Sequence, residues 1–136
     1  DILAVEKAIK LSKDLGVKKA VILPVSAPFH CQLMEPAQRV MENALKDLIF
    51  KTPIVPIIPN VDVSPEINPD KLRKNLIYQV TGTVKWRETM KFADKQGVKK
   101  VIELGSGKVL SGIAKRMIKN VVTISIENTE DFENFL

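Results

Sequence analysis

The sequence predicts an α/β fold, and two observations lead to this prediction. In the second half of the chain, apolar segments of strand length alternate with amphipathic segments of helical length, which is typical of parallel βα units. The length of 136 residues and the apolar fraction of 45% fit one ordinary domain with a buried core. Because the chain begins with Asp1 inside a helical repeat rather than with methionine, we interpret it as a piece of a longer protein.

The first predicted elements are a helix and a strand. Apolar residues recur at helical spacing over residues 2–15, and Gly16 follows where a left-handed cap is expected. Residues 17–25 hold a short apolar run rich in β-branched residues, so they are predicted as a strand that leads into a proline-containing loop at 26–34.

The middle of the chain predicts two further helices joined by extended chain and a loop. Pro36 suits the first turn of a helix whose apolar stripe runs to Ile49. The chain is then expected to be extended over 54–58 and to loop over 60–68. Asn68 is a suitable cap for the next helix, because a first-turn proline and a first-turn acid follow it.

The last predicted elements form the alternating α/β pattern. Trp86, Met90 and Ala93 share one face of a helix that stops at Gly97. The elements expected after it are a strand at 101–104, the turn Gly105-Ser106-Gly107, a helix at 108–119 and a strand at 121–126. The octets GVKKAVIL (16–23) and GVKKVIEL (97–104) echo each other, which we attribute to the same arrangement of a glycine cap before a buried strand.

Composition excludes several classes of protein. A single cysteine, Cys31, and a single histidine, His30, cannot form a usual zinc site or an intramolecular disulfide. No apolar run approaches the length of about 18 residues that a membrane span needs, and the first residues do not resemble a signal peptide. We therefore expect a soluble protein in a reducing compartment, with no metal and no membrane association.

Positive charge is concentrated in one segment. Residues 69–120 hold thirteen Lys and Arg against four Asp and Glu, whereas residues 1–68 hold eight of each kind. An anionic partner is expected to meet the basic segment. Nucleic acid is a weak candidate, because few aromatic side chains that could stack on bases accompany the charges.

The turn at 105–107 and the helix after it have two readings each. The turn lacks the third glycine of a dinucleotide-binding motif, since position 110 is leucine. We therefore favour a tight structural turn, and anion binding by the N–H groups at the start of the helix remains the alternative. On the helix, a basic stripe is either a solvated face or a docking site for an acidic partner. The stripe is Lys108, Lys115 and Lys119, with Arg116 beside it, opposite the expected apolar face of Val109, Ile113 and Met117.

The loop at 26–34 is the candidate catalytic segment. It follows a predicted buried strand, and catalytic groups of α/β folds cluster beyond the carboxyl ends of strands. The pattern alone leaves open whether His30 is structural or catalytic. Cys31 is a poor candidate nucleophile, because adjacent side chains usually diverge and His30 is the only histidine that could activate it.

One segment around this loop resembles the catalytic-histidine segment of the malonyl-CoA:acyl carrier protein transacylases. It reads Pro24-Val25-Ser26-Ala27-Pro28-Phe29-His30-Cys31-Gln32-Leu33-Met34-Glu35-Pro36-Ala37. The similarity continues along nearly the whole chain through Pro59-Asn60-Val61-Asp62, Gln79, Val84-Lys85-Trp86, Gly97-Val98, and the stretch from Glu103 to Gly112.

The resemblance implies a ping-pong acyl transfer in fatty acid biosynthesis. A serine takes malonyl from coenzyme A and passes it to the phosphopantetheine thiol of acyl carrier protein, with a histidine as general base. His30 matches that histidine, and Gln79 matches the residue whose backbone carbonyl orients it. Phe29 matches a position where a bulky aromatic accompanies malonyl selectivity, and the basic stripe is the expected landing site of the acidic carrier protein. The resemblance implies no cofactor, since malonyl-CoA is a substrate, and no nucleic-acid partner. It also implies a location in the cytoplasm or in an organelle matrix.

The chain also departs from the family pattern. It contains no GxSxG nucleophile elbow, so the serine, the malonyl-binding arginine and the oxyanion hole are expected outside this chain, and the chain alone is expected to be inactive. By resemblance, residues 1–24 end a ferredoxin-like small subdomain and residues 25–136 form the C-terminal part of a hydrolase-like catalytic subdomain. The alternatives are an acyltransferase domain of a polyketide synthase, or a non-catalytic α/β module that binds anions through residues 69–120.

Overall fold

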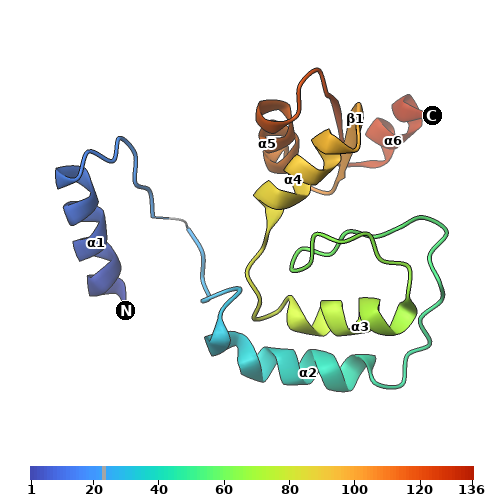
Figure 1. The fold of residues 1–136 in the computed structure, drawn as a ribbon, viewed down its shortest axis with the longest axis horizontal. Helices are drawn as coiled ribbons and strands as arrows, with labels where there is room; N and C mark the ends of the chain where they lie inside the picture. The colour runs from blue at the N-terminus through green and yellow to red at the C-terminus, as the bar shows by residue number, and fades with distance from the viewer. Residues whose placement is uncertain (23) are drawn as a thin grey trace.

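A computed structural model describes residues 1–22 and 24–136 of the chain. Helices predominate, and the strands lie near the C-terminal end (Figure 1). The elements in order are α1 (Ile2–Asp14), the 3₁₀ turn η1 (Gln32–Met34), α2 (Glu35–Leu45), α3 (Pro69–Tyr78), α4 (Trp86–Lys95), β1 (Lys100–Leu104), α5 (Val109–Met117), β2 (Val122–Ile126) and α6 (Thr129–Phe135).

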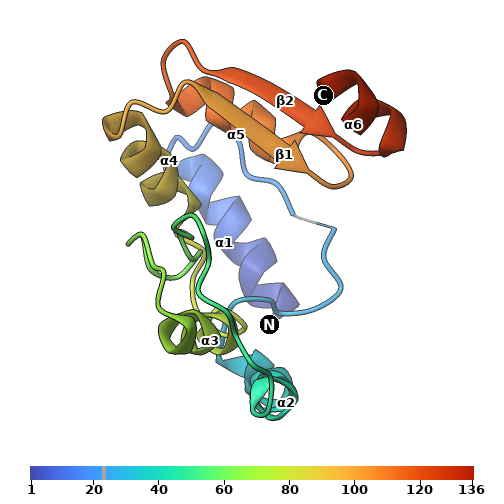
Figure 2. The same cartoon turned by 90° about the vertical axis from the view of Figure 1, so that its right-hand side faces the viewer.

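The C-terminal elements form a parallel βαβ unit, as the sequence predicts. β1 pairs with β2 in parallel from Lys100 opposite Val122 to Leu104 opposite Ile126, and α5 makes the crossover between them. Figure 2 shows the two strands side by side with α5 against them. The buried core lies where α4 meets α5, at Met90, Ala114, and Ile118 just past the end of α5, with Trp86 and Ala93 packed against it. The expected common face of Trp86, Met90 and Ala93 is therefore confirmed.

The middle of the chain forms a pair of antiparallel helices. α2 and α3 pack against each other, and in Figure 1 α2 runs toward the right while α3 runs back toward the left. The side chain of Asn68 accepts hydrogen bonds from the backbone N–H groups of Asp70 and Lys71, at 3.0 and 3.1 Å, so the predicted cap is confirmed. This pairing brings the chain before α2 close to the chain after α3.

Helix α1 stands apart from the other elements. It ends at Asp14, and Gly16 adopts a left-handed φ of +81°, with its N–H bonded to the carbonyl of Lys13 and that of Val17 bonded to Ser12. The predicted glycine cap is thus confirmed. α1 packs against no other described helix or strand and has no buried residue.

The predicted strand at 17–25 is wrong for the residues that the structure describes. Residues 17–22, 24 and 25 pair with no strand, and Leu23 of the same prediction lies outside the described residues. A strand needs a hydrogen-bonded neighbour, and within the described part of the chain none lies beside this segment. The described residues of this apolar segment therefore lie in irregular chain and are exposed.

Two differences concern the C-terminal end. The helix predicted over 108–119 is shorter, and Val109 is 71% exposed rather than buried, because the buried face of α5 is formed by Ser111 and Ala114. α6 was not anticipated, although Asn128 caps it by accepting from the N–H of Asp131 at 2.9 Å. Among the residues described, no helix combines the length and apolar character that crossing a membrane requires.

Candidate active site

The backbone of His30 has an unusual conformation. Its φ is +60°, in the left-handed region that costs a residue with a side chain roughly 1–2 kcal/mol. Such strain is maintained only where surrounding contacts outweigh it, and it concentrates at functional sites. His30 lies two residues before η1, which leads directly into α2, so the strained residue sits at the end of the loop where the helix begins.

A long-range hydrogen bond fixes the imidazole. Nδ1 of His30 lies 2.9 Å from the backbone carbonyl oxygen of Gln79. A carbonyl oxygen only accepts, so Nδ1 carries the hydrogen in this contact, and in the neutral ring Nε2 is left as a proton acceptor. The ring is therefore oriented as a general base requires, by a backbone acceptor in the place where a triad has a carboxylate.

Gln79 owes its position to the end of α3. It is the C-cap residue of that helix, and its N–H donates to the carbonyl of Asn75 at 2.9 Å. The sequence paired His30 with Gln79 only through the family resemblance, and the structure brings the two into contact. Their catalytic roles stay predictions.

The neighbours of His30 are placed as follows. Phe29 is 54% exposed, and His30 is exposed as well. The thiol of Cys31 donates to the carbonyl of Pro28 at 3.1 Å rather than to the imidazole, which agrees with the expectation that the two side chains diverge. Among residues 1–22 and 24–136, no serine, threonine or cysteine side chain is hydrogen-bonded to His30.

Two polar links between α2 and α3 were not foreseen. The hydroxyl of Thr81 donates to Oε1 of Gln38 at 2.7 Å, close to His30 and Gln79 in the chain. At the opposite end of α2, the guanidinium of Arg73 donates to three backbone carbonyls, those of Leu45 (2.6 Å), Lys46 (2.8 Å) and Leu48 (2.7 Å). No local sequence signal marks either link, because each joins residues at least 25 positions apart.

An apolar pocket of about 330 Å³ adjoins the site. It lies between α3 and the segment 50–60, and its lining includes Ile57, Leu72 and Leu76 together with Gln79. His30 is not part of this lining. Gln79 thus accepts the hydrogen bond of the imidazole through its backbone carbonyl and also borders an apolar pocket.

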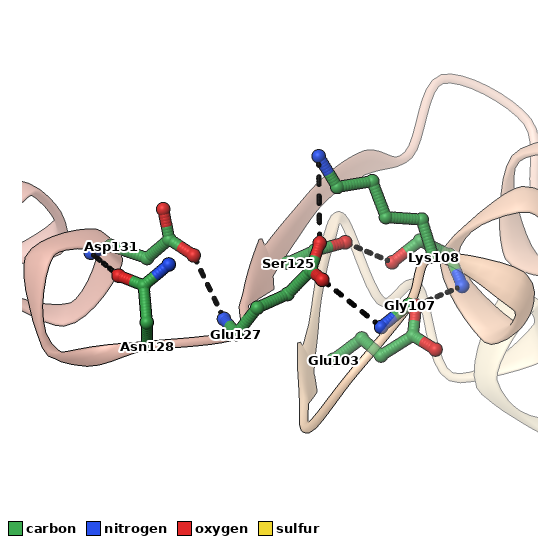
Figure 3. A network of polar contacts seen from close by, with 8 residues as sticks. Glu103, Gly107, Lys108, Ser125, Glu127, Asn128 and Asp131 are labelled. Atoms are coloured by element: carbon green, nitrogen blue, oxygen red, sulfur yellow. Dashed lines mark hydrogen bonds and ion pairs between the residues drawn. The ribbon is translucent and has the colours of Figure 1, made fainter.

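The turn after β1 is occupied by the chain's own carboxylates, as Figure 3 shows. Glu103 accepts from the backbone N–H groups of Leu110 (3.0 Å) and Ser111 (2.7 Å) at the start of α5. Glu127 accepts from Gly107 N–H at 3.2 Å and pairs with Lys108 Nζ at 3.6 Å. The Ser111 hydroxyl, followed by the two N–H groups, holds the pKa of Glu103 below its ordinary value. These donors are already used, which disfavours the reading of this helix start as an anion site.

The basic stripe is exposed along its whole length. Lys108 precedes α5, Lys115 lies within it and Lys119 follows it. Lys108 and Lys115 border one shallow pocket of about 340 Å³ beside β2, and Lys115 and Lys119 border a second of similar volume. Lys115 borders both pockets, so the three lysines lie along adjoining stretches of the surface.

Comparison with solved structures defines the class of fold. The chain superimposes on an acyl-carrier-protein S-malonyltransferase from Bartonella henselae with a TM-score of 0.86 and 46% identity, over 98% of this chain and 42% of that one. It likewise matches a malonyl-transacylase in complex with a type II PKS acyl-carrier protein, with a TM-score of 0.84 and 36% identity, over 96% of this chain and 42% of the other. The chain has the fold of part of an α/β acyltransferase.

Sequence comparison identifies the relatives within that class. The chain is 39% identical to the malonyl CoA-acyl carrier protein transacylase of Escherichia coli (strain K12) over 123 residues, which are 90% of this chain and 40% of the relative. No family model matches the chain. The chain is thus a homologue of malonyl CoA-acyl carrier protein transacylases, and it spans about 40% of the length of the curated relatives it matches.

Proposed function

We propose that this chain is the histidine-bearing part of a malonyl-CoA:acyl carrier protein transacylase of fatty acid biosynthesis. The observation that carries the proposal is the hydrogen bond between His30 Nδ1 and the Gln79 carbonyl, because it leaves Nε2 available as a base. Homology to enzymes that bear this name supports the reaction class. The transfer would take place in the cytoplasm or in an organelle matrix.

In the proposed mechanism, Nε2 of His30 takes the proton of a serine hydroxyl that a part of the enzyme outside this chain supplies. The serine oxygen attacks the thioester carbonyl of malonyl-CoA, and the imidazolium returns the proton to the departing coenzyme A thiol. In the second half-reaction the phosphopantetheine thiol gives its proton to Nε2 of His30 and attacks the malonyl-serine ester, and the imidazolium returns that proton to the departing serine oxygen. Coenzyme A is the acyl carrier, and no cofactor takes part.

We assign residues 1–24 to the end of a small ferredoxin-like subdomain and residues 25–136 to the large catalytic subdomain. Two features support this division: α1 makes no packing contact with the other described elements, and residues 17–22 pair with no strand within the described chain. In the complete enzyme, the missing part would supply both the packing surface for α1 and the serine.

We assign acyl carrier protein as the protein partner, and the surface of Lys108, Lys115 and Lys119 as its docking site. A malonyl-transacylase that shares this fold binds its acyl-carrier protein. All three lysines are exposed, and a carrier protein of acidic character would be attracted to them. Lys108 contributes less than the other two in this assignment, because Glu127 partly neutralises its charge.

One alternative keeps the same chemistry in another setting. The solved malonyl-transacylase in complex with a type II PKS acyl-carrier protein makes a polyketide carrier protein the second candidate partner. The non-catalytic anion-binding module is less well supported, because Glu103 and Glu127 already occupy the N–H groups at the start of α5.

The test measures malonyl transfer to carrier protein in the longer enzyme that carries this chain. His30→Ala should lower the acylation rate by about 10²- to 10⁴-fold, the usual contribution of general acid–base catalysis. Cys31→Ser is the matched control, since the Cys31 thiol is bonded to a backbone carbonyl rather than to the imidazole. Its acylation rate should stay within about threefold of the parent rate, far above the rate expected for a variant that lacks the base. The purified 136-residue chain should show no turnover. A His30→Ala rate within the same threefold would overturn the assignment.

A further inference from the structure

We infer that Thr81 and Gln38 are positioning residues that hold the histidine loop against the Gln79 carbonyl. As far as catalysis is concerned, the inference rests on the proposed function. The claim about the geometry of the imidazole stands on the structure of the chain and is tested separately below.

The first step concerns the nature of the acceptor. His30 is bonded to the main-chain oxygen of Gln79, so no side chain at position 79 supplies the contact. The position of that oxygen depends on whatever fixes the backbone at the end of α3. Within α3 this is the Gln79 N–H bond to Asn75, but a bond inside one helix does not fix the distance to the loop that carries His30.

The second step identifies a link that fixes this distance. Thr81 lies two residues after Gln79, and Gln38 lies eight residues after His30, in the first half of α2. The Thr81 hydroxyl donates to Gln38 Oε1 at 2.7 Å, and both residues are half-buried. The two segments are therefore joined twice in the same region, once at the imidazole and once at this side-chain pair.

The third step explains why the site needs a second link. His30 is exposed and its backbone is held at φ +60°, so relaxation of the loop would release strain. One hydrogen bond at an exposed site has only a small net stabilising effect, since water competes for both partners. The Thr81–Gln38 pair is better shielded, and it opposes the relaxation that would draw the imidazole away from Gln79.

The fourth step concerns the opposite end of the helix pair. Arg73 of α3 is bonded to the carbonyls of Leu45, Lys46 and Leu48, which follow the body of α2. α2 is thus attached to α3 at one end by Arg73 and at the other by Gln38. Loss of the Thr81–Gln38 link would leave the histidine end of α2 held only by the packing of the two helices and by the exposed His30–Gln79 bond itself.

The experiment compares variants of the longer enzyme by nitrogen-15 NMR of the imidazole and by steady-state malonyl transfer. The His30 signals are assigned by their loss in His30→Gln. Thr81→Val removes the hydroxyl and keeps the shape, Thr81→Ser restores the hydroxyl, and Gln38→Leu removes the acceptor. Arg39→Gln is the control, because it breaks an exposed ion pair with Glu35 within α2, and among the described residues Arg39 makes no hydrogen bond or ion pair to α3.

Thr81→Val and Gln38→Leu should each lower the fraction of His30 in the Nδ1–H tautomer and lower kcat by about fivefold, the factor expected from one hydrogen bond of ordinary net strength. KM for malonyl-CoA should change little, Thr81→Ser should recover both readouts, and Arg39→Gln should leave both unchanged. The double variant should be no worse than either single variant, because both remove the same bond.

Parent-like tautomer populations in both Thr81→Val and Gln38→Leu would overturn the inference, as would additive losses in the double variant. If Thr81→Val does not fold, Gln38→Leu alone decides, since it breaks the same bond from the other helix. If His30→Ala leaves malonyl transfer unchanged, the proposed function fails, whereas the tautomer measurement still tests the positioning role.

Discussion

The imidazole of His30 and the backbone carbonyl of Gln79 lie 2.9 Å apart although 49 residues separate them in the chain. The side chain of Gln79 takes no part in this hydrogen bond. A glutamine therefore orients the histidine without using the amide group that distinguishes it from other residues.

This relationship predicts a contrast between two substitutions. Gln79→Leu keeps the carbonyl oxygen and the helix end, so we expect it to lower kcat for malonyl transfer by less than about tenfold. His30→Ala removes the base and is expected to cost at least about 10²-fold. Steady-state kinetics of both variants provides the check. A Gln79→Leu loss as large as that of His30→Ala would mean that the amide side chain itself acts in catalysis.

Phe29 is expected to select malonyl over methylmalonyl groups. The ring directly precedes His30 and is 54% exposed, so it is free to border a bound acyl group. One methyl group against a ring corresponds to roughly 1–3 kcal/mol of discrimination. Phe29→Ser should therefore narrow the ratio of kcat/KM values for malonyl-CoA and methylmalonyl-CoA. An unchanged ratio would place the selecting group elsewhere.

Charge reversal of Lys115 and Lys119 tests the docking surface. Exposed ion pairs contribute under about 1 kcal/mol each and act mainly on encounter rate, so Lys115→Glu/Lys119→Glu should raise KM for carrier protein and flatten its salt dependence. The half-reaction with malonyl-CoA should change much less. Lys7→Glu/Lys10→Glu on α1 is the control with the same charge change. Equal slowing of both half-reactions would contradict the docking role and would mean that the three lysines form an ordinary solvated helix face.

Arg73 is expected to stabilise the helix pair. Its guanidinium bonds three carbonyls and lies 4.9 Å from the centroid of the Phe50 ring. Arg73→Met keeps most of the aliphatic stem and removes the donors, which should lower the free energy of unfolding by about 1 kcal/mol, because the bond to Leu45 is partly shielded whereas water can replace the guanidinium at the exposed carbonyls of Lys46 and Leu48. Urea unfolding followed by circular dichroism measures it. Lys74→Met, at the next and exposed position of α3, should be close to neutral.

Glu103 is expected to make stability depend on acid pH. Because the pKa of Glu103 is lowered in the folded protein by Ser111 and Leu110, unfolding takes up a proton at pH values between the folded and the unfolded pKa. The stabilisation is complete above the unfolded pKa, near 4.5, and is lost as pH falls through the lower folded value. Glu103→Gln should therefore reduce stability at pH 7 and flatten its decline below about pH 4.5.

Urea unfolding at several pH values, followed by the fluorescence of Trp86, the single tryptophan of the chain, provides the measurement. Glu133→Gln on α6 is the control, because in the described structure its carboxylate makes no hydrogen bond or ion pair. Parallel pH curves for the parent and Glu103→Gln would contradict the role of Glu103 at the start of α5.

Local signals in the sequence determined the helix ends and the parallel strand pair. Asn68 caps α3, and Gly16 and Gly97 adopt φ of +81° and +75° after α1 and α4, because capping depends on residues a few positions apart. The resemblance pointed to His30 and Gln79 through motifs that are read directly from the chain. These features needed no knowledge of packing.

Tertiary structure alone decided which extended segment became a strand and what holds the histidine. The octets at 16–23 and 97–104 are nearly alike, yet among their described residues only those of the second form a strand, because β2 lies beside it and shares its hydrogen bonds. Val109 is exposed because the neighbouring elements, rather than helical periodicity, fix the rotation of α5. The Thr81–Gln38 and Arg73 links join residues 25 or more positions apart, so they exist only once α2 has packed on α3.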